Sequence, residues 1–285
     1  MVQYIFDKSG NIERPVEKKK ESRKDPKNQL NDLTGQEWIR FQKSWFIHSP
    51  PPRSEQEVLH PAKFPESLIT EFIQFFTKKG QWVLDPFVGT GSTLVACDMT
   101  ERNGVGIELY EKYVQIGKKR TKQQIICGDA RQLLPILQET GQKFHLCITS
   151  PPYWNILTRG RVPKSPYQIQ RVKKKLDTQY GFDKQDIGLI RSYTGYIETL
   201  VSICKEVSKL LYYNRYLIVI IQNVRVQGRV CPLAFDLTVA LSKFLIYKGE
   251  RIWCQDNKKL HPFAYPYDFS PNIFHHYCLI FKKGV

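Results

Sequence analysis

The sequence has few of the features that mark secreted, metal-binding or membrane-spanning proteins. No apolar run approaches the roughly 20 residues that a bilayer span needs, and residues 1–10 lack the basic-then-apolar order of a signal peptide. No two of the seven cysteines form a C-x-x-C pair, and the six histidines show no metal-ligand spacing. We therefore expect an intracellular protein with buried, reduced thiols, no metal and no membrane partner.

Acidic residues are also scarce. The chain has 27 Asp and Glu against 43 Lys and Arg, which gives a formal net charge of +16. Such an excess indicates a polyanionic partner, although it specifies no chemistry. A length of 285 residues and an apolar fraction of 41% suffice for one large domain with a packed core.

The first part of the chain differs in composition from the rest. Residues 7–32 are rich in Lys, Glu, Asp and Asn and poor in large apolar side chains, which is typical of a solvated segment. Aromatic anchors begin at Trp38. We therefore expect a basic N-terminal arm over residues 1–37 and a single domain over residues 38–285.

Helices and strands alternate from Phe64 onward. Pro65 fits a first helical turn, and Lys78, Lys79 and Gly80 suit the end of that helix. Further helices are expected from Ser92 and over residues 196–211. The expected buried strands are the short apolar segments 82–84, 105–107, 124–127, 146–149 and 217–221. This alternation predicts an α/β fold with a mostly parallel sheet covered by helices on both faces.

Three acidic residues stand where consecutive strands end. Asp85 opens a glycine-containing turn, Glu108 ends the next strand and Asp129 follows the third. The turn is no P-loop because no Gly-Lys-Ser/Thr follows, and the dinucleotide fingerprint lacks its third glycine because Leu94 stands there. Each acid alone is explained by helix capping. Together the three acids fit S-adenosylmethionine bound at the carboxyl ends of the strands. Asp85 would lie near its cationic group, Glu108 would accept from its ribose, and Asp129 would accept from its adenine.

A stiff segment follows the fourth strand. Thr149-Ser150-Pro151-Pro152-Tyr153-Trp154 contains adjacent prolines, which lack N–H groups and cannot continue a sheet ladder. Such rigidity aims the Ser150 side chain and backbone carbonyls into the cleft, and Tyr153 and Trp154 offer flat faces for an unstacked base. A proline-rich turn with two core aromatics is the simpler alternative.

Two segments resemble loops of the DNA amino-methyltransferases, which make N4-methylcytosine or N6-methyladenine. Asp85-Pro86-Phe87-Val88-Gly89-Thr90-Gly91 resembles the family's cofactor loop, and Ser150-Pro151-Pro152-Tyr153 resembles its catalytic loop. The likeness covers roughly residues 38–285. His60-Pro61-Ala62-Lys63-Phe64-Pro65 resembles the family's segment that contacts the methionine part of the cofactor, while 265–272 and 275–281 resemble its last sheet strands. The resemblance implies a Rossmann-like S-adenosylmethionine-dependent methyltransferase fold, with about seven strands and an antiparallel last strand.

The resemblance also implies roles for individual residues. The implied catalytic residues are Ser150, Pro151, Pro152 and Tyr153. The implied contacts to S-adenosylmethionine come from His60, Pro61, Ala62, Phe64, Asp85, Pro86, Phe87, Gly89, Gly91, Ser92, Thr93, Glu108, Leu109, Asp129 and Ala130.

Within the family, serine at the first catalytic position is associated with transfer to cytosine N4, and Asp or Asn with adenine N6. Ser150 therefore favours site-specific methylation of cytosine N4 in double-stranded DNA, by direct displacement on a flipped base. A cytoplasmic, nucleoid-associated setting beside a cognate restriction enzyme follows from the resemblance. Carbon-5 methylation and zinc-dependent deamination are disfavoured because the chain has neither Pro-Cys nor P-C-x-x-C.

A basic insertion, residues 155–190, follows the catalytic segment directly. Residues 159–184 contain eight Lys or Arg but only two acidic residues, Asp177 and Asp183. We interpret it as a DNA-contacting insertion, with a solvated loop as the alternative. Beside Trp154, the expected DNA contacts are Arg159, Arg161, Lys164, Arg171, Lys173, Lys174 and Lys175.

Three other functions fit the same residues. They are adenine-N6 methylation of DNA, methylation of a base in structured RNA, and binding of nucleic acid without catalysis. No large separate recognition domain is evident, so the insertion, residues 223–249, the N-terminal arm or a second subunit would supply recognition. Both a monomer and a homodimer remain open.

Overall fold

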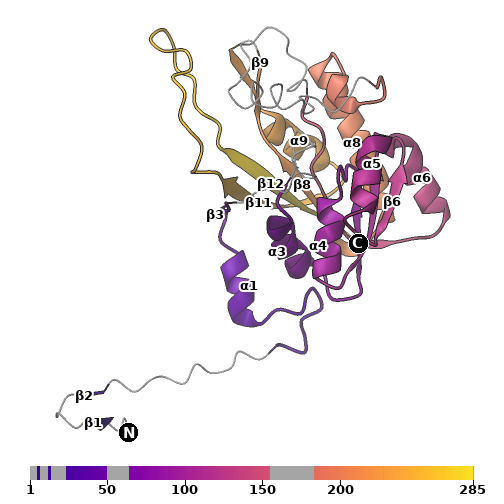
Figure 1. Cartoon of the computed structure of the whole chain (residues 1–285), viewed down its shortest axis with the longest axis vertical. Coiled ribbons are helices and arrows are strands. Elements are labelled where there is room, and N and C mark those ends of the chain that lie inside the picture. Colours follow the sequence, from indigo (N-terminus) through magenta and orange to yellow (C-terminus); the bar gives the residue numbers. More distant parts are fainter. Residues whose placement is uncertain are drawn as a thin grey trace.

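The computed structural model describes residues 24–49, 64–154, 183–226 and 228–284, together with the backbone of two short antiparallel strands, β1 (Ile5–Phe6) and β2 (Ile12–Glu13). Its centre is an eight-stranded sheet (Figure 1). In sheet order the strands are β3 (Trp45–Ile47), β11 (Ile246–Cys254), β12 (His275–Lys282), β8 (Leu211–Ile221), β7 (Phe144–Thr149), β4 (Trp82–Asp85), β5 (Asn103–Glu108) and β6 (Gln124–Cys127).

Strand β12 runs antiparallel to both of its neighbours, β11 and β8, and every other adjacent pair in this sheet is parallel. This topology confirms the α/β fold with a mostly parallel sheet and an antiparallel last strand. Strand β3 adds one strand beyond the expected seven. A separate hairpin joins β9 (Val224–Val226) to β10 (Arg229–Cys231).

Helices cover both faces of the sheet (Figure 1). One face carries α1 (Gly35–Phe41), α3 (Glu66–Phe76) and α4 (Ser92–Met99), and the other carries α6 (Ala130–Glu139), α8 (Tyr193–Leu210) and α9 (Leu233–Leu241). Helix α5 (Glu111–Lys118) closes a smaller apolar cluster, and a 3-10 turn, η1 (Ile187–Leu189), precedes α8.

The apolar run at the end of β8 shows why both faces are covered. Leu217, Val219 and Ile221 pack in the cluster under α6, α8 and α9, whereas Ile218 and Ile220 pack in the cluster under α1 and α3. Successive side chains of a strand point to opposite faces, so a continuous apolar run needs an apolar layer on each side.

Helix α3, the helix expected after Phe64, ends earlier than predicted. Thr77 leaves the helical conformation at φ −142°, and its hydroxyl donates to the Ile73 carbonyl over 2.5 Å. The same carbonyl also accepts the Thr77 N–H over 3.0 Å, so the hydroxyl reinforces the last backbone bond of the helix. Because the Thr77 backbone is extended, Lys78, Lys79 and Gly80 lie beyond the helix rather than in its last turn.

Two further expectations need correction. Residues 265–272 form no strand; they belong to a long loop between β11 and β12. Packed structure also begins before residue 38, because the Asn31 amide is buried and donates to the Phe75 carbonyl over 2.6 Å.

The cysteines match their expected state only in part. All seven are free, and Cys97, Cys147, Cys204 and Cys278 are buried, where burial raises their thiol pKa values. Cys127 is exposed because it ends the edge strand β6, and Cys231 and Cys254 are half-buried.

Candidate active site

The turn after β4, residues 85–91, is held against the end of β5 and is called the cofactor loop below, after its predicted role. The Val88 N–H donates to the Ile107 carbonyl over 2.9 Å, and the Gly89 N–H donates to Glu108 Oε2 over 3.0 Å. Gly91 has φ 88° and starts α4 from a left-handed conformation that favours glycine. The loop is therefore a short, fixed backbone cradle at the carboxyl edge of the sheet.

The three acidic residues of the strand ends gather at this edge. Strands β4, β5 and β6 are direct neighbours, so Asp85, Glu108 and Asp129 follow one another across the sheet. Their exposed fractions are 4%, 9% and 6%. The juxtaposition expected from their order in the chain is therefore present, in a site largely shielded from water.

Asp85 joins the cofactor loop to β7. Its Oδ1 accepts the Thr149 hydroxyl over 2.6 Å and the Phe87 N–H over 3.0 Å, and its Oδ2 accepts the Thr93 hydroxyl over 2.5 Å. Burial raises the pKa of Asp85, and these hydrogen bonds oppose the rise. The hydrogen-bonding capacity of the carboxylate is thus used by donors of the chain itself. Because Thr149 directly precedes Ser150, its bond to Asp85 also makes the cofactor loop and the catalytic loop neighbours.

Glu108 offers a fixed carboxylate at the end of β5. Oε1 accepts the Tyr110 N–H over 2.9 Å, and Oε2 accepts the Gly89 N–H. Burial raises the pKa of Glu108 to about 7; the two backbone hydrogen bonds lower it, and the charges of Asp186 and Asp85 raise it. Each oxygen keeps a lone pair, an arrangement suited to accepting two hydroxyls of a diol.

This elevated pKa makes stability depend on pH. Because the folded chain binds the Glu108 proton more tightly than the unfolded chain does, its contribution is present in full below the ordinary pKa of 4.5 and is lost as the pH rises through about 7. We expect wild type to lose up to about 3 kcal/mol relative to Glu108→Gln between pH 4 and 8. Urea unfolding across this range measures the difference. The exposed control Glu101→Gln should track wild type, and parallel curves for wild type and Glu108→Gln would contradict the prediction.

Asp129 and Ala130 begin α6. Asp129 Oδ1 accepts the Arg131 N–H over 2.9 Å as a helix cap, and the Arg131 guanidinium pairs with both carboxylate oxygens. This pair also raises the pKa of Arg131. The capping alternative is thus present in the structure, and an adenine amino group would have to share Asp129 with Arg131.

The other predicted cofactor residues are either partly or fully buried or brace the loop through hydrogen bonds. Phe64, Phe87 and Leu109 are half-buried and Pro86 is buried. The Ser92 hydroxyl donates to Glu66 over 3.3 Å, as Thr93 does to Asp85, so both brace the loop. His60, Pro61 and Ala62 lie outside the described residues.

Arg120 is a bracing residue that sequence reasoning missed. Its guanidinium donates to the Thr90 carbonyl over 2.5 Å and pairs with Glu66. It therefore ties the cofactor loop to the start of α3. No sequence signal marks it, because its partners are 30 and 54 residues away.

The catalytic loop, residues 150–153, leaves the end of β7. Ser150 is half-buried and Pro151 is buried, while the Pro152 carbonyl accepts the hydroxyl of the buried Tyr196 over 2.9 Å. Among the described residues no hydrogen bond occupies the Ser150 hydroxyl or the Pro151 carbonyl. The loop is therefore held through Pro152, and two acceptors beside the cofactor loop remain open.

The prediction that Trp154 offers a face to a base is wrong for this structure. Its side chain is only 8% exposed and belongs to the main core cluster. The indole N–H donates to the Ile190 carbonyl over 2.7 Å, and the ring packs against Tyr193 at 5.0 Å. Burying this large ring with its N–H satisfied makes Trp154 an anchor of the loop.

Tyr153 is held by a cluster of aromatic side chains from distant segments. Its hydroxyl lies 3.0 Å from His276 Nδ1, and His276 stacks on Trp253 at 4.7 Å. Phe64 packs on both of these rings. Burial lowers the pKa of His276 to about 3, so the ring is neutral. Side chains alternate between the two faces along β12, so His276 lies on the same face as the buried Cys278 and Ile280. This alternation is the sequence signal that could have predicted the position of His276.

The remaining predicted DNA contacts are Arg159, Arg161, Lys164, Arg171, Lys173, Lys174 and Lys175, and they lie outside the described residues. Within the described ranges no group of three or more His, Cys, Asp or Glu is placed to hold a metal ion. Likewise, no helix in this part of the chain is long and apolar enough to cross a membrane.

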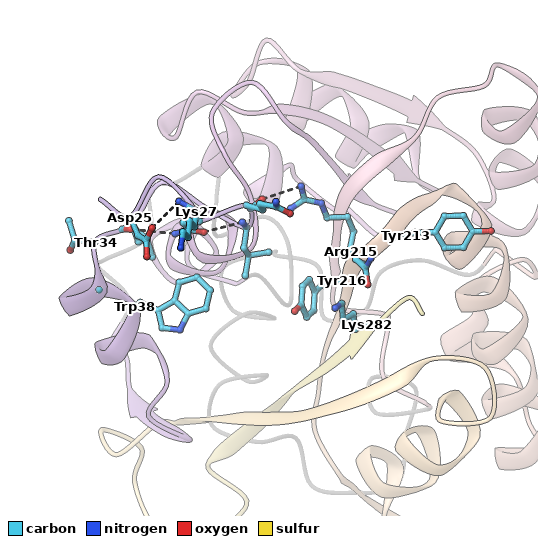
Figure 2. Close-up of a pocket in the computed structure, with 14 residues that line it drawn as sticks. Asp25, Lys27, Thr34, Trp38, Tyr213, Arg215, Tyr216 and Lys282 are labelled. Atoms are coloured by element: carbon cyan, nitrogen blue, oxygen red, sulfur yellow. Dashed lines mark hydrogen bonds between the residues drawn. The ribbon is translucent and has the colours of Figure 1, made fainter. Parts of the chain in front are cut away.

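A hollow of about 860 Å³ lies elsewhere on the domain (Figure 2). It is lined by residues before and within α1, including Trp38, and by the start of β8, including Arg215 and Tyr216. Strand β8 runs parallel to β7, so its start lies at the edge opposite the catalytic loop. None of the predicted site residues line this hollow.

Several curated proteins match part of this chain. The matching curated proteins include the type II methyltransferase M.BglI of Bacillus subtilis, 37% identical over 92 residues, and M.Cfr9I of Citrobacter freundii, 48% identical over 61 residues. These matches cover 32% and 21% of this chain, and only 26% and 20% of those relatives. The match therefore spans about a quarter of the relatives' length.

Solved structures give a weaker likeness. TrmN from Thermus thermophilus is 12% identical with a TM-score of 0.45, over 76% of this chain and 48% of that one. A methyltransferase from Pyrococcus furiosus is 12% identical with a TM-score of 0.43, over 78% and 84%. These scores are too low to support an argument about function.

The family comparison covers the N-terminal part of the chain. Residues 3–119 match the model of the N6_N4_Mtase family, described as DNA methylase, and this range contains the cofactor loop and the ends of β4 and β5. The resemblance inferred from the glycine turn is thereby confirmed over residues 3–119, which are similar to the DNA methylases of the N6/N4 family; the Ser-Pro-Pro-Tyr segment lies beyond the matched range.

Proposed function

We propose that the chain is an S-adenosylmethionine-dependent DNA methyltransferase that acts on the exocyclic amine of a base, with cytosine N4 as the target. The observation that carries this proposal is the 2.6 Å hydrogen bond from Thr149 to Asp85, which fastens the end of β7, directly before the catalytic loop, to the cofactor loop. The match of residues 3–119 to the DNA methylase family supports it. The domain proposed to do this is 38–285, with the insertion 155–190 contacting duplex DNA.

The strand ends fit the proposed cofactor. Glu108 presents two oriented carboxylate oxygens suited to a ribose diol, and the glycines of the cofactor loop allow close approach of a ligand to the backbone. Phe64 is half-buried beside the catalytic loop, where it can pack on the methionine part. When bound, S-adenosylmethionine supplies an activated methyl group on a sulfonium.

The catalytic loop supplies acceptors for the base. An exocyclic amine is a weak nucleophile because its lone pair is delocalised into the ring. The Ser150 hydroxyl and the Pro151 carbonyl accept its two N–H groups, orient the lone pair and stabilise the positive charge that develops on nitrogen. The proton released afterwards leaves through Ser150 to solvent. Tyr153, held by His276, stacks on the flipped base.

Cytosine N4 is preferred over adenine N6 because a serine stands at position 150, where the resembled family has Asp or Asn in its adenine enzymes. The named relatives are type II methyltransferases, which favours a restriction-modification setting with a cognate restriction enzyme.

The test is mass spectrometry of nucleosides after incubation of purified protein with S-adenosylmethionine and either duplex DNA or structured RNA. We expect N4-methylcytosine in DNA, and sequencing of the product then gives the target motif. If N6-methyladenine is found instead, the target base is adenine rather than cytosine. If only the RNA is methylated, the substrate is RNA rather than DNA. Loss of all methylation with binding to nucleic acid retained would favour the non-catalytic alternative.

A further inference from the structure

The loop between β11 and β12, residues 255–274 and called the arm below, projects from the domain (Figure 1). Cys254 pairs with His275 at its base, and Tyr277 pairs with Ile221 at the end of β8. Because β8 is parallel to β7, the base of the arm lies at the same sheet edge as the catalytic loop. His276, the second residue of β12 after the arm, lies 3.0 Å from the Tyr153 hydroxyl of the catalytic loop.

The base of the arm is tied down by side chains. Asn272 makes two hydrogen bonds with the His261 backbone, at 2.9 and 3.0 Å, and thereby closes the arm across its width. The Gln222 amide donates to the Ile273 and His275 carbonyls over 3.2 and 2.8 Å. Arg225 stacks on Phe263 at 4.7 Å and donates to the Pro271 carbonyl. Such bracing gives the outer part of the arm a defined direction.

The outer part presents aromatic side chains to solvent. Tyr265, Tyr267 and Phe269 are 79%, 93% and 85% exposed. Each such ring offers roughly 150–250 Å² for burial. Adjacent exposed apolar side chains on a braced element are characteristic of a binding surface, because scattered single exposed residues would need no such support.

The charges near the arm are mainly basic. Lys258 and Lys259 are exposed at its start, and Arg229 is exposed on β10, next to the Arg225 brace. Asp256 and Asp268 are the acidic residues of the arm. Aromatic faces among cationic side chains complement the bases and phosphates of nucleic acid.

We propose that the arm binds duplex DNA beside the target base, with Tyr265, Tyr267 and Phe269 contacting bases and Lys258 and Lys259 contacting phosphates. This inference rests on the proposed function and adds a recognition element to it. It assigns recognition to a segment other than the insertion, the N-terminal arm or residues 223–249. A second copy of the chain is the competing partner, and the experiment separates the two.

The experiment compares wild type with a triple variant carrying Tyr265→Ala, Tyr267→Ala and Phe269→Ala. Fluorescence anisotropy measures Kd for a duplex containing the target motif across a salt series, and calorimetry measures S-adenosylmethionine binding. We expect the triple variant to bind the duplex between about fivefold and a hundredfold more weakly. The slope of log K against log salt should be unchanged, because aromatic contacts release no counterions.

Two further variants complete the test. Lys259→Gln should lower the magnitude of the salt slope by about one. Tyr212→Ala removes an aromatic ring that is 46% exposed at the opposite edge, and it should bind the duplex as wild type does. S-adenosylmethionine affinity and Tm should stay at wild-type values in all three proteins.

The outcomes distinguish a failure of the proposed function from a failure of the inference about the arm. If wild type neither binds nor methylates duplex DNA, the proposed function fails. If wild type does both and the triple variant keeps the wild-type Kd, the inference about the arm is overturned. A triple variant that only converts a dimer into a monomer in sedimentation velocity, with DNA affinity retained, would assign the arm to self-association instead.

Discussion

Ser150→Ala is expected to lower kcat about 100- to 1,000-fold, with little change in the affinity for S-adenosylmethionine or DNA. In the proposed mechanism its hydroxyl, which accepts no hydrogen bond from the described residues, accepts one from the amine, and that bond strengthens as positive charge develops on the nitrogen. An interaction stronger in the transition state than in the bound substrate appears in kcat rather than in KM.

Single-turnover methylation of labelled duplex DNA measures this effect. Ser208→Ala is the matched control, since its exposed hydroxyl donates to the Lys205 carbonyl on α8, outside the loops of the site. We expect wild-type rates from the control. A Ser150→Ala enzyme with unchanged kcat would remove serine from the mechanism and leave the Pro151 carbonyl as the acceptor.

Asp85→Ala is expected to lower the free energy of unfolding by about 3 kcal/mol. The change leaves the Thr93 and Thr149 hydroxyls and the Phe87 N–H without their acceptor in a buried site. Each buried donor without a partner costs roughly 1–3 kcal/mol, and release of the desolvation that raises the Asp85 pKa offsets part of the loss. The cofactor loop and catalytic loop lose their shared fastening at the same time.

Urea unfolding measures the loss, and Asp98→Ala provides the control. Asp98 also accepts three hydrogen bonds, from Thr121, Lys122 and Gln123, but it lies on the exposed side of α4. We expect its loss to cost under about 1 kcal/mol. Equal costs for the two variants would show that burial does not distinguish them. Thr149→Val, which removes one donor only, should fall between them.

Local patterns predicted the sheet and the position of its loops. The apolar run in β8 and the short segments of β4 to β7 are recognisable because burial on both faces requires continuous apolar residues. The acidic strand ends were predicted as neighbours because parallel strands place their carboxyl ends at one edge. Thr77 shows where this reasoning loses resolution, since its extended backbone ends α3 before the two lysines that were expected in the last turn.

Side-chain partners could not be predicted in the same way. Nothing local distinguishes a tryptophan that faces a base from one that anchors a loop, and packing with Tyr193 made Trp154 an anchor. His276 contacts Tyr153 across 123 residues, and Asp85 contacts Thr149 across 64. Sequence by itself determined the α/β sheet, its acidic edge and the two loops, because these depend on periodicity and on residue type. The tertiary structure alone decided which carboxylates, rings and hydroxyls meet, because such contacts depend on how the sheet brings distant segments together.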